Sequence, residues 1–283
     1  MSSGRAILVL VAATVVWGST FSVVKGALAA TGPLTFLALR FGLATVLVLP
    51  ALRLGHVTRR DLWLSLPCGA TLFAGYALQT AGLATTTPSR SAFITALSVL
   101  LVPLLESLGD GCRPTRWQWS GAMVALVGLA LLLRPAATPV SLGDALTGGC
   151  AIAFALHILT LQRAVRTVGA ARVNGIQILC TAVLALPAAG FEGWSLRWTA
   201  QLLVAVVVCA GLATVFAFWA MTTVQRVLSG TQTAVVLAFE PVAAAVLSVA
   251  LGQEALSAAL VAGGILVVAG VLLATASRTH SRL

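Results

Sequence analysis

A glutamate and a proline stand side by side in the middle of a long apolar run, in the stretch LAFEPVAAAV at residues 237–246. Glu240 is the only ionisable residue between positions 231 and 251. Removing a carboxylate from water is costly, and Pro241 cannot donate the hydrogen bond that the Leu237 carbonyl would accept in a regular helix. The sequence therefore predicts a kinked helix here, with Glu240 and Pro241 as candidates for gating or coupling.

Three roles for the Glu240 carboxylate fit this pattern. It could exchange a proton along a substrate path, hold a partner such as a backbone amide or Arg40, or stay protonated and hydrogen-bonded and so fix the kink. Arg40, in the stretch LALRF, is the third candidate for gating or coupling. Its long side chain either extends outward toward water or pairs with a group inside the protein.

Aromatic and hydrogen-bonding side chains in other apolar runs are candidates for a binding cavity. In GYALQTAG (75–82), Tyr76, Gln79 and Thr80 follow the i, i+3, i+4 spacing of one helix face. Small-molecule sites are lined mainly by apolar and aromatic side chains with a few polar groups. The predicted substrate-binding residues are Trp17, Thr20, Tyr76, Gln79, Thr80, His157, Phe218 and Trp219.

Each of these candidates has a competing structural interpretation. Trp219 is also suited to the lipid interface, and a threonine such as Thr20 often bonds back to its own helix. His157 is the only histidine inside an apolar run, and it could serve as a structural hydrogen-bond donor. The Tyr76–Gln79 pair is the strongest candidate for substrate contact.

The composition predicts that lipid surrounds these runs. The 283-residue chain is 59% hydrophobic and 8% charged, with a mean hydropathy of +1.04, whereas soluble domains carry about 25% charged residues. The net charge is +10, but the arginines are scattered between apolar runs and form no basic patch of the kind that binds nucleic acid. We expect a lipid bilayer and a small-molecule substrate as partners, and no nucleic acid.

The sequence indicates neither a metal site nor a cofactor. Its five cysteines are dispersed without metal-ligand or redox spacing; they are Cys68, Cys112, Cys150, Cys180 and Cys209. The first apolar run, which starts at Ala6, is too long for a signal peptide and has many similar runs after it, so we expect a retained helix.

The apolar runs predict an all-α integral membrane protein with ten transmembrane helices, because about 20 apolar residues cross a bilayer. The spans expected are 6–26, 33–53, 62–82, 88–108, 116–134, 143–163, 172–190, 199–221, 229–251 and 255–276. With the N-terminus inside, twelve lysines and arginines flank the inner side and four the outer side, which are Lys25, Arg90, Arg134 and Arg197. The excess of positive charge predicts that both termini are cytoplasmic.

The chain resembles itself after a shift of 138 residues. SAFITALSVLLVP (91–103) then falls on SGTQTAVVLAFEP (229–241), and a four-residue length difference afterwards brings Gly121 and Gly128 onto Gly263 and Gly270. We expect two five-helix repeats, residues 1–138 and 139–283. Five is odd, so the repeats are inverted relative to each other, a construction that many secondary transporters share. The seven-residue glycine spacing predicts helix packing or subunit contacts.

WGSTFSVVK (17–25), LALRF (37–41) and the ending LAFEPVAAAVLSVALGQEALSAALVAGGILVVAGVLL (237–273) resemble the drug/metabolite transporter superfamily, in its EamA-type ten-helix branch. The resemblance covers nearly the whole chain and is strongest at Glu240–Pro241, Gly252, Glu254, Gly263 and Gly270. The first half departs from it at Asp110–Gly111, where a Gly-Glu pair is expected. Because the resemblance makes Glu-Pro common to carriers of different substrates, it favours a structural or gating role for Glu240.

The resemblance implies a carrier in a bacterial-type inner (plasma) membrane that exports small metabolites. We expect amino acids as the substrate and alternating access as the mechanism, with a drug or cationic-compound exporter as the alternative. An integral-membrane enzyme is a remote alternative, because paired catalytic carboxylates and a nucleophile with a base are absent from the sequence. The sequence leaves the coupling ion open, and it leaves monomer and homodimer equally possible.

Overall fold

The computed structural model describes residues 1–53, 56–108, 113–133, 139–250 and 256–276. Within them, the helices are α1 (Ser3–Ala27), α2 (Pro33–Arg53), α3 (Arg59–Thr85), α4 (Pro88–Ala96), α5 (Ser98–Leu108), α6 (Arg116–Leu133), α7 (Leu142–Ala164), α8 (Ala170–Glu192), α9 (Ala200–Ala210), η1 (Gly211–Phe216), α10 (Ala217–Val224), α11 (Gly230–Leu237), α12 (Glu240–Ala250) and α13 (Ala258–Ala276). Residues named above that lie outside the described part are Asp110, Gly111, Cys112, Arg134, Gly252 and Glu254.

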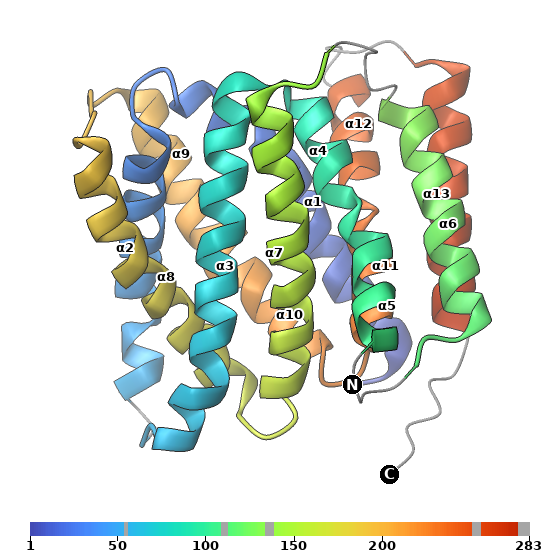
Figure 1. Cartoon of the computed structure of the whole chain (residues 1–283), viewed down its shortest axis with the longest axis horizontal. Coiled ribbons are helices and arrows are strands. Elements are labelled where there is room, and N and C mark those ends of the chain that lie inside the picture. Colours follow the sequence, from blue (N-terminus) through green and yellow to red (C-terminus); the bar gives the residue numbers. More distant parts are fainter. Residues whose placement is uncertain (54–55, 109–112, 134–138, 251–255, 277–283) are drawn as a thin grey trace.

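These elements form a membrane-spanning bundle, as expected from the composition. Nine helical segments of the described chain are long and apolar enough to cross a bilayer. The more polar α3 has 27 residues, which is also sufficient, and it lies among the others (Figure 1). The predicted all-α membrane fold is confirmed, and each described helix boundary lies within a few residues of the corresponding expected span.

Two of the membrane segments are broken in the middle. The helix expected to kink at Pro241 stops at Leu237 and starts again at Glu240. The segment that starts at Pro88 is interrupted in the same way, between α4 and α5 at Leu97. The sequence pattern predicted the first interruption and not the second.

The two broken segments correspond to each other with a shift of 142 residues. α4 and α11 begin 142 residues apart, and so do the 11-residue helices α5 and α12. The expected 138-residue register is therefore wrong for this segment by about one helical turn. Pro103 and Pro241 do not occupy equivalent places; Glu240 instead corresponds to Ser98.

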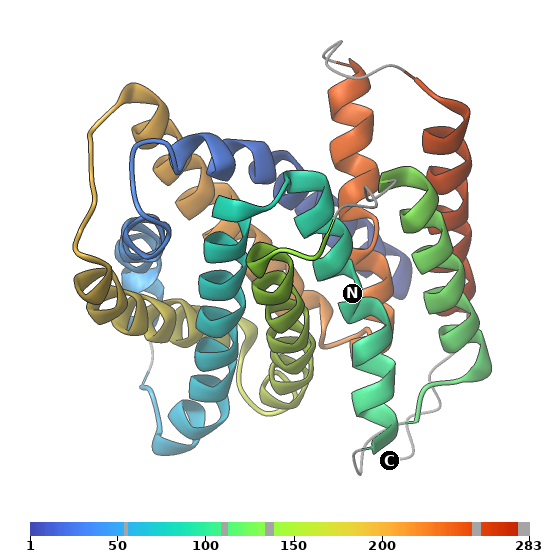
Figure 2. The same cartoon turned by 45° about the horizontal axis from the view of Figure 1, so that its top comes forward.

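The four glycines with seven-residue spacing form one tight helix contact inside the chain. α6 and α13 pack against each other at one edge of the bundle (Figure 2). A Cβ on Gly121 would lie 2.5 Å from the Gly270 carbonyl, and a Cβ on Gly128 would lie 2.7 Å from the Gly263 carbonyl. Of the two uses expected for these glycines, the structure shows helix packing.

The remaining helices enclose the centre of the bundle. α3 packs on α7 and α8, α2 packs on α8, and α1 packs on α10 and α12. The contact between α1 and α12 is close, because a Cβ on Gly18 would lie 2.6 Å from the Glu240 carbonyl oxygen. This packing places Trp17, next to Gly18, beside the broken segment that carries Glu240.

Candidate functional site

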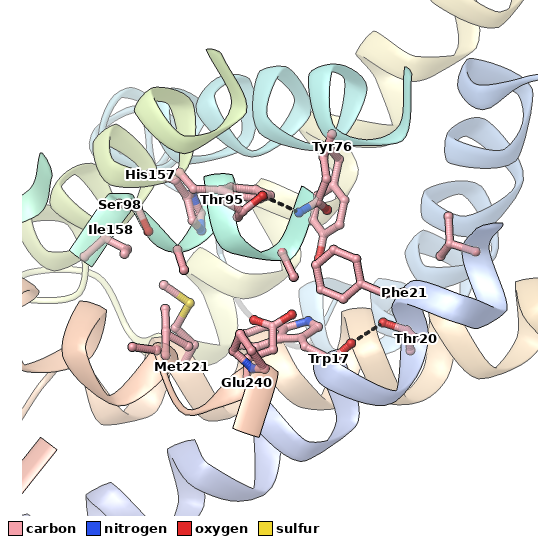
Figure 3. A pocket seen from close by; sticks show the side chains of 18 of the residues that line it. Trp17, Thr20, Phe21, Tyr76, Thr95, Ser98, His157, Ile158, Met221 and Glu240 are labelled. Carbon is pink, nitrogen blue, oxygen red and sulfur yellow. Dashed lines mark hydrogen bonds between the residues drawn. The ribbon is translucent and has the colours of Figure 1, made fainter. Parts of the chain in front are cut away.

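A cavity with an empty volume of about 990 Å³, including its open mouth, lies among α1, α2, α3, α4, α5, α7, α10, α11 and α12. It extends from Val24 and Leu83, near the ends of α1 and α3, to Met221, near the end of α10. Figure 3 shows Tyr76, His157 and Glu240 pointing into it from three different helices. Both helix breaks border the cavity, through Ser98 and through Glu240.

Arg40 is the buried cation of this cavity. Its side chain is only 3% exposed. Nε donates to Thr214 Oγ1 at 2.7 Å, and Nη2 donates to the Tyr76 hydroxyl at 3.1 Å and to the Ala213 carbonyl at 3.2 Å. Nη1 has no hydrogen-bond partner, and no carboxylate pairs with the guanidinium, among the described residues. Of the two expectations for Arg40, the structure shows the inward one.

A π-helical segment supplies the acceptors for Arg40. In η1 the backbone hydrogen bonds follow the i→i+5 pattern of a π-helix. Such turns are rare in proteins, and those that occur often lie at functional sites. The Ala213 carbonyl in this segment also accepts a 2.8 Å hydrogen bond from Trp17 Nε1, and Thr214 Oγ1 donates to the Cys209 carbonyl. The irregular turn therefore fixes the positions of Arg40 and Trp17 together.

The Glu240 carboxylate faces the cavity without a protein partner. Glu240 lines the cavity, and its side chain makes no hydrogen bond or ion pair with the described residues. The hydrogen-bonded structural glutamate considered from the sequence is therefore not the arrangement found here. Among the described residues that line the cavity, Arg40 supplies a guanidinium and Glu240 supplies a carboxyl group.

Aromatic rings form much of the cavity wall. Trp17 and Phe218 lie with ring centroids 5.2 Å apart, and Tyr76 contacts Phe154 edge-on at 5.3 Å. The Arg40 guanidinium carbon lies 4.4 Å from the Tyr76 ring centroid, within the range of a cation–π contact. These ring contacts pack the cavity wall beside Arg40.

The structure brings most of the predicted site residues together. Those that line the cavity are Trp17, Thr20, Arg40, Tyr76, Gln79, Thr80, His157, Phe218, Glu240 and Pro241. Trp219 does not line the cavity, and its prediction as a cavity residue is corrected. Its side chain is 45% exposed, and its ring lies near the ring of Phe216. Consecutive residues of a helix point about 100° apart, so Trp219 and Phe218 do not face the same cavity. For all of the predicted residues that line the cavity, contact with a substrate remains a prediction.

Several polar candidates are partly satisfied by the protein. Thr20 donates to the Trp17 carbonyl of its own helix at 2.7 Å. Gln79 Nε2 donates to Thr95 Oγ1 at 3.3 Å, which links α3 to α4 beside the cavity. Of the two ring nitrogens of His157, Nδ1 contacts the Cys68 carbonyl, and Nε2 has no partner in the part of the chain that the structure describes.

Sequence reasoning missed Ser98, Thr95, Phe154, Ile158 and Met221, which also line the cavity. A 142-residue shift for the fourth spans would have found Ser98, because it places this residue on Glu240. The sequence reasoning also missed Glu106, which lies outside the cavity. Its carboxylate accepts a hydrogen bond from the Thr231 hydroxyl, and this bond joins the end of α5 to the start of α11. Among the described residues, no group of three or more metal-binding side chains is present.

A multi-pass helical bundle with discontinuous helices around an internal aromatic cavity is the architecture of a membrane transporter. The EamA-like transporter family matches the chain twice, at residues 4–134 and 141–276. The chain belongs to this family, as its resemblance implied.

One curated relative and one solved structure are similar to this chain over most of its length. An uncharacterized transporter of Archaeoglobus fulgidus is 29% identical over 258 residues, which are 91% of this chain and 82% of the relative. A solved crystal structure of another protein superposes with a TM-score of 0.82 at 23% identity, over 97% of this chain and 98% of that chain. At that identity the similarity shows the fold alone.

Proposed function

We propose that this protein exports amino acids across a bacterial-type inner membrane by alternating access. The observation that carries the proposal is the presence of a guanidinium and a carboxyl group in the wall of one aromatic cavity, at Arg40 and Glu240. A free amino acid carries a carboxylate and an ammonium group. The carboxylate finds the Arg40 guanidinium in the cavity, and the ammonium group finds the Glu240 carboxyl group, whose ionised form it stabilises. Family membership supports transport, and the cavity chemistry supports the substrate class.

Arg40 is suited to the carboxylate. A guanidinium presents donors in a planar fork that matches a carboxylate, and Nη1 has its donors unused among the described residues. A buried, unpaired charge costs several kcal/mol, so an anionic group arriving at Arg40 relieves an existing penalty. Glu240 gives the ammonium group an equivalent partner.

Arg40 also argues against the alternative substrate class. An exporter of organic cations needs a carboxylate in its cavity, and Glu240 would serve. A fixed guanidinium in the same cavity repels a purely cationic compound, however, and this repulsion is strong where water is scarce. The zwitterion uses both charges. The described residues that line the cavity support binding and transport of a small molecule.

Alternating access is supported by the correspondence between the two halves. The family matches each half of the chain separately. The segment α4–α5 of the first half and the segment α11–α12 of the second half break at corresponding places. The last helix of each half, α6 or α13, packs on the other through paired glycines. We infer two inverted five-helix repeats, with both termini cytoplasmic as the distribution of lysine and arginine predicts. The cavity lies between the repeats, where rocking of one against the other exposes it to either side.

Transport by purified protein in proteoliposomes tests the proposal. Vesicles loaded with a mixture of labelled amino acids are expected to lose some of them faster than protein-free vesicles. The same vesicles are tested with a labelled organic cation, and each assay is run with and without a proton gradient. Efflux of the cation with no efflux of any amino acid would reject the proposed substrate class in favour of the alternative.

A further inference from the structure

His157 brings a second, unused polar group to the cavity. It lies in α7 and is 2% exposed. Its Nδ1 lies 3.0 Å from the Cys68 carbonyl oxygen, and its Nε2 has no hydrogen-bond partner among the described residues. His157 lines the cavity with Ile158 and Met221, and in the view of Figure 3 it points inward from the side opposite Trp17 and Thr20.

The contact with Cys68 fixes which nitrogen carries the proton. A carbonyl oxygen can only accept a hydrogen bond, so Nδ1 must be the donor. No carboxylate contacts the ring among the described residues, and its surroundings include the apolar Ile158 and Phe218. A neutral imidazole is the stable form in such a place, and a neutral ring with its proton on Nδ1 has a lone pair on Nε2. His157 therefore holds a hydrogen-bond acceptor just inside the cavity wall, where Nε2 is buried and unpartnered among the described residues.

A buried acceptor without a partner is unfavourable, and it is a strong discriminator between ligands. A site built to hydrogen-bond a ligand O–H or N–H rejects the analogue that lacks it, because the polar group of the site is then left unsatisfied. Arg40 and Glu240 already match the two charges that every amino acid shares. The Nε2 acceptor is left for the part in which amino acids differ.

We propose that a small shift of the cavity wall on substrate binding lets His157 Nε2 accept a hydrogen bond from the side chain of the transported amino acid. The protein thereby selects side chains bearing an O–H or N–H donor. This inference rests on the proposed amino-acid transport. Side chains of nearly equal shape that lack the donor, such as valine in place of threonine, leave Nε2 unsatisfied. The specificity is therefore set by one atom of α7, independently of the groups that bind the shared charges.

Competition between matched amino acids in proteoliposomes tests this selectivity. The pairs are threonine and valine, serine and alanine, and tyrosine and phenylalanine, each differing in one hydroxyl group. In the wild-type protein, the hydroxylated member of the best-transported pair is expected to compete about tenfold better or more. Equal competition within every transported pair, or a preference for the apolar member, would overturn the inference and leave amino-acid transport standing.

Two substitutions separate the cavity acceptor from the structural contact. In His157→Asn the side-chain amide can still donate to the Cys68 carbonyl but no longer reaches the Nε2 position, so the preference is expected to fall to near unity. In His157→Gln the amide oxygen can occupy the Nε2 position, and part of the preference should return. A preference unchanged in His157→Asn would contradict the inference. If wild-type protein transports no amino acid at all, the proposed function fails and the inference fails with it.

Discussion

Ser98 and Glu240 occupy corresponding places in the two halves of the chain: each is the first residue of an 11-residue helix that follows a break. Both line the cavity. One half thus contributes a hydroxyl group at this place and the other half contributes a carboxylate. The difference makes the cavity wall asymmetric, and the proposed binding of an amino acid uses the half that carries the carboxyl group.

Replacing Glu240 by Gln tests whether the carboxylate binds the substrate ammonium group. The amide keeps the size of the side chain and removes its charge, so amino-acid transport is expected to fall about tenfold or more, as for the loss of a charge-assisted hydrogen bond. Both gradient-driven efflux and exchange at zero gradient should fall. Ser98→Ala, which removes no charge, should have a much smaller effect. Intact exchange with lost gradient-driven accumulation would instead make Glu240 a proton-coupling residue.

Pro241→Ala tests the contribution of the helix break. The substitution restores an N–H donor, and the Leu237 carbonyl is its acceptor in a continuous helix. We expect transport to slow, because opening and closing of the cavity would depend on the interruption, while substrate affinity changes little. Turnover and apparent affinity are measured separately in the same vesicles. A variant with wild-type turnover would show that the break does not need the proline.

The contact between α6 and α13 predicts a steric effect on stability. In Gly128→Ala the new Cβ would lie 2.7 Å from the Gly263 carbonyl, so the helices must separate. Overpacking of this kind costs about 1–3 kcal/mol, and the melting temperature in detergent should fall. Gly148→Ala in α7 is the matched control, because its Cβ would meet nothing within 4 Å. Equal melting temperatures for the two variants would show that the contact tolerates expansion.

The orientation of the bundle is tested by labelling single cysteines in a variant whose native cysteines are replaced. Cysteine at Arg59 or Thr167 should react with a membrane-impermeant reagent only after the cells are opened. Cysteine at Val140 or Phe191, which are 81% and 94% exposed, should react in intact cells. The opposite pattern would place both termini outside and reverse the direction of transport that we propose.

Much of the fold follows from the sequence because the bilayer restricts it. Long apolar runs must form helices that satisfy their own backbone hydrogen bonds, so the spans could be located from charges and prolines. The break at Pro241 has a local cause in the missing donor. The break at Leu97 has no proline beside it, and nothing in the local sequence indicates it.

The site was partly predictable for a similar reason. Polar side chains in membrane helices turn inward, which located Tyr76, Gln79 and His157. The partners of Arg40 were beyond prediction, because Ala213 and Thr214 lie in the π-helical turn of η1, which the local sequence does not indicate. Trp219 was misplaced because an aromatic residue is as suitable for lipid as for a cavity, and only the phase of its helix decides between them.

The transport rates of an amino acid and of its α-carboxamide test most directly whether Arg40 binds the substrate carboxylate. The carboxamide keeps the ammonium group and the side chain and loses the negative charge. Wild-type protein should transport the amino acid at least about tenfold better, and Arg40→Gln should lose both most of its transport and this preference. Wild-type transport of the two compounds at equal rates, or an Arg40→Gln variant that keeps the preference, would contradict the account.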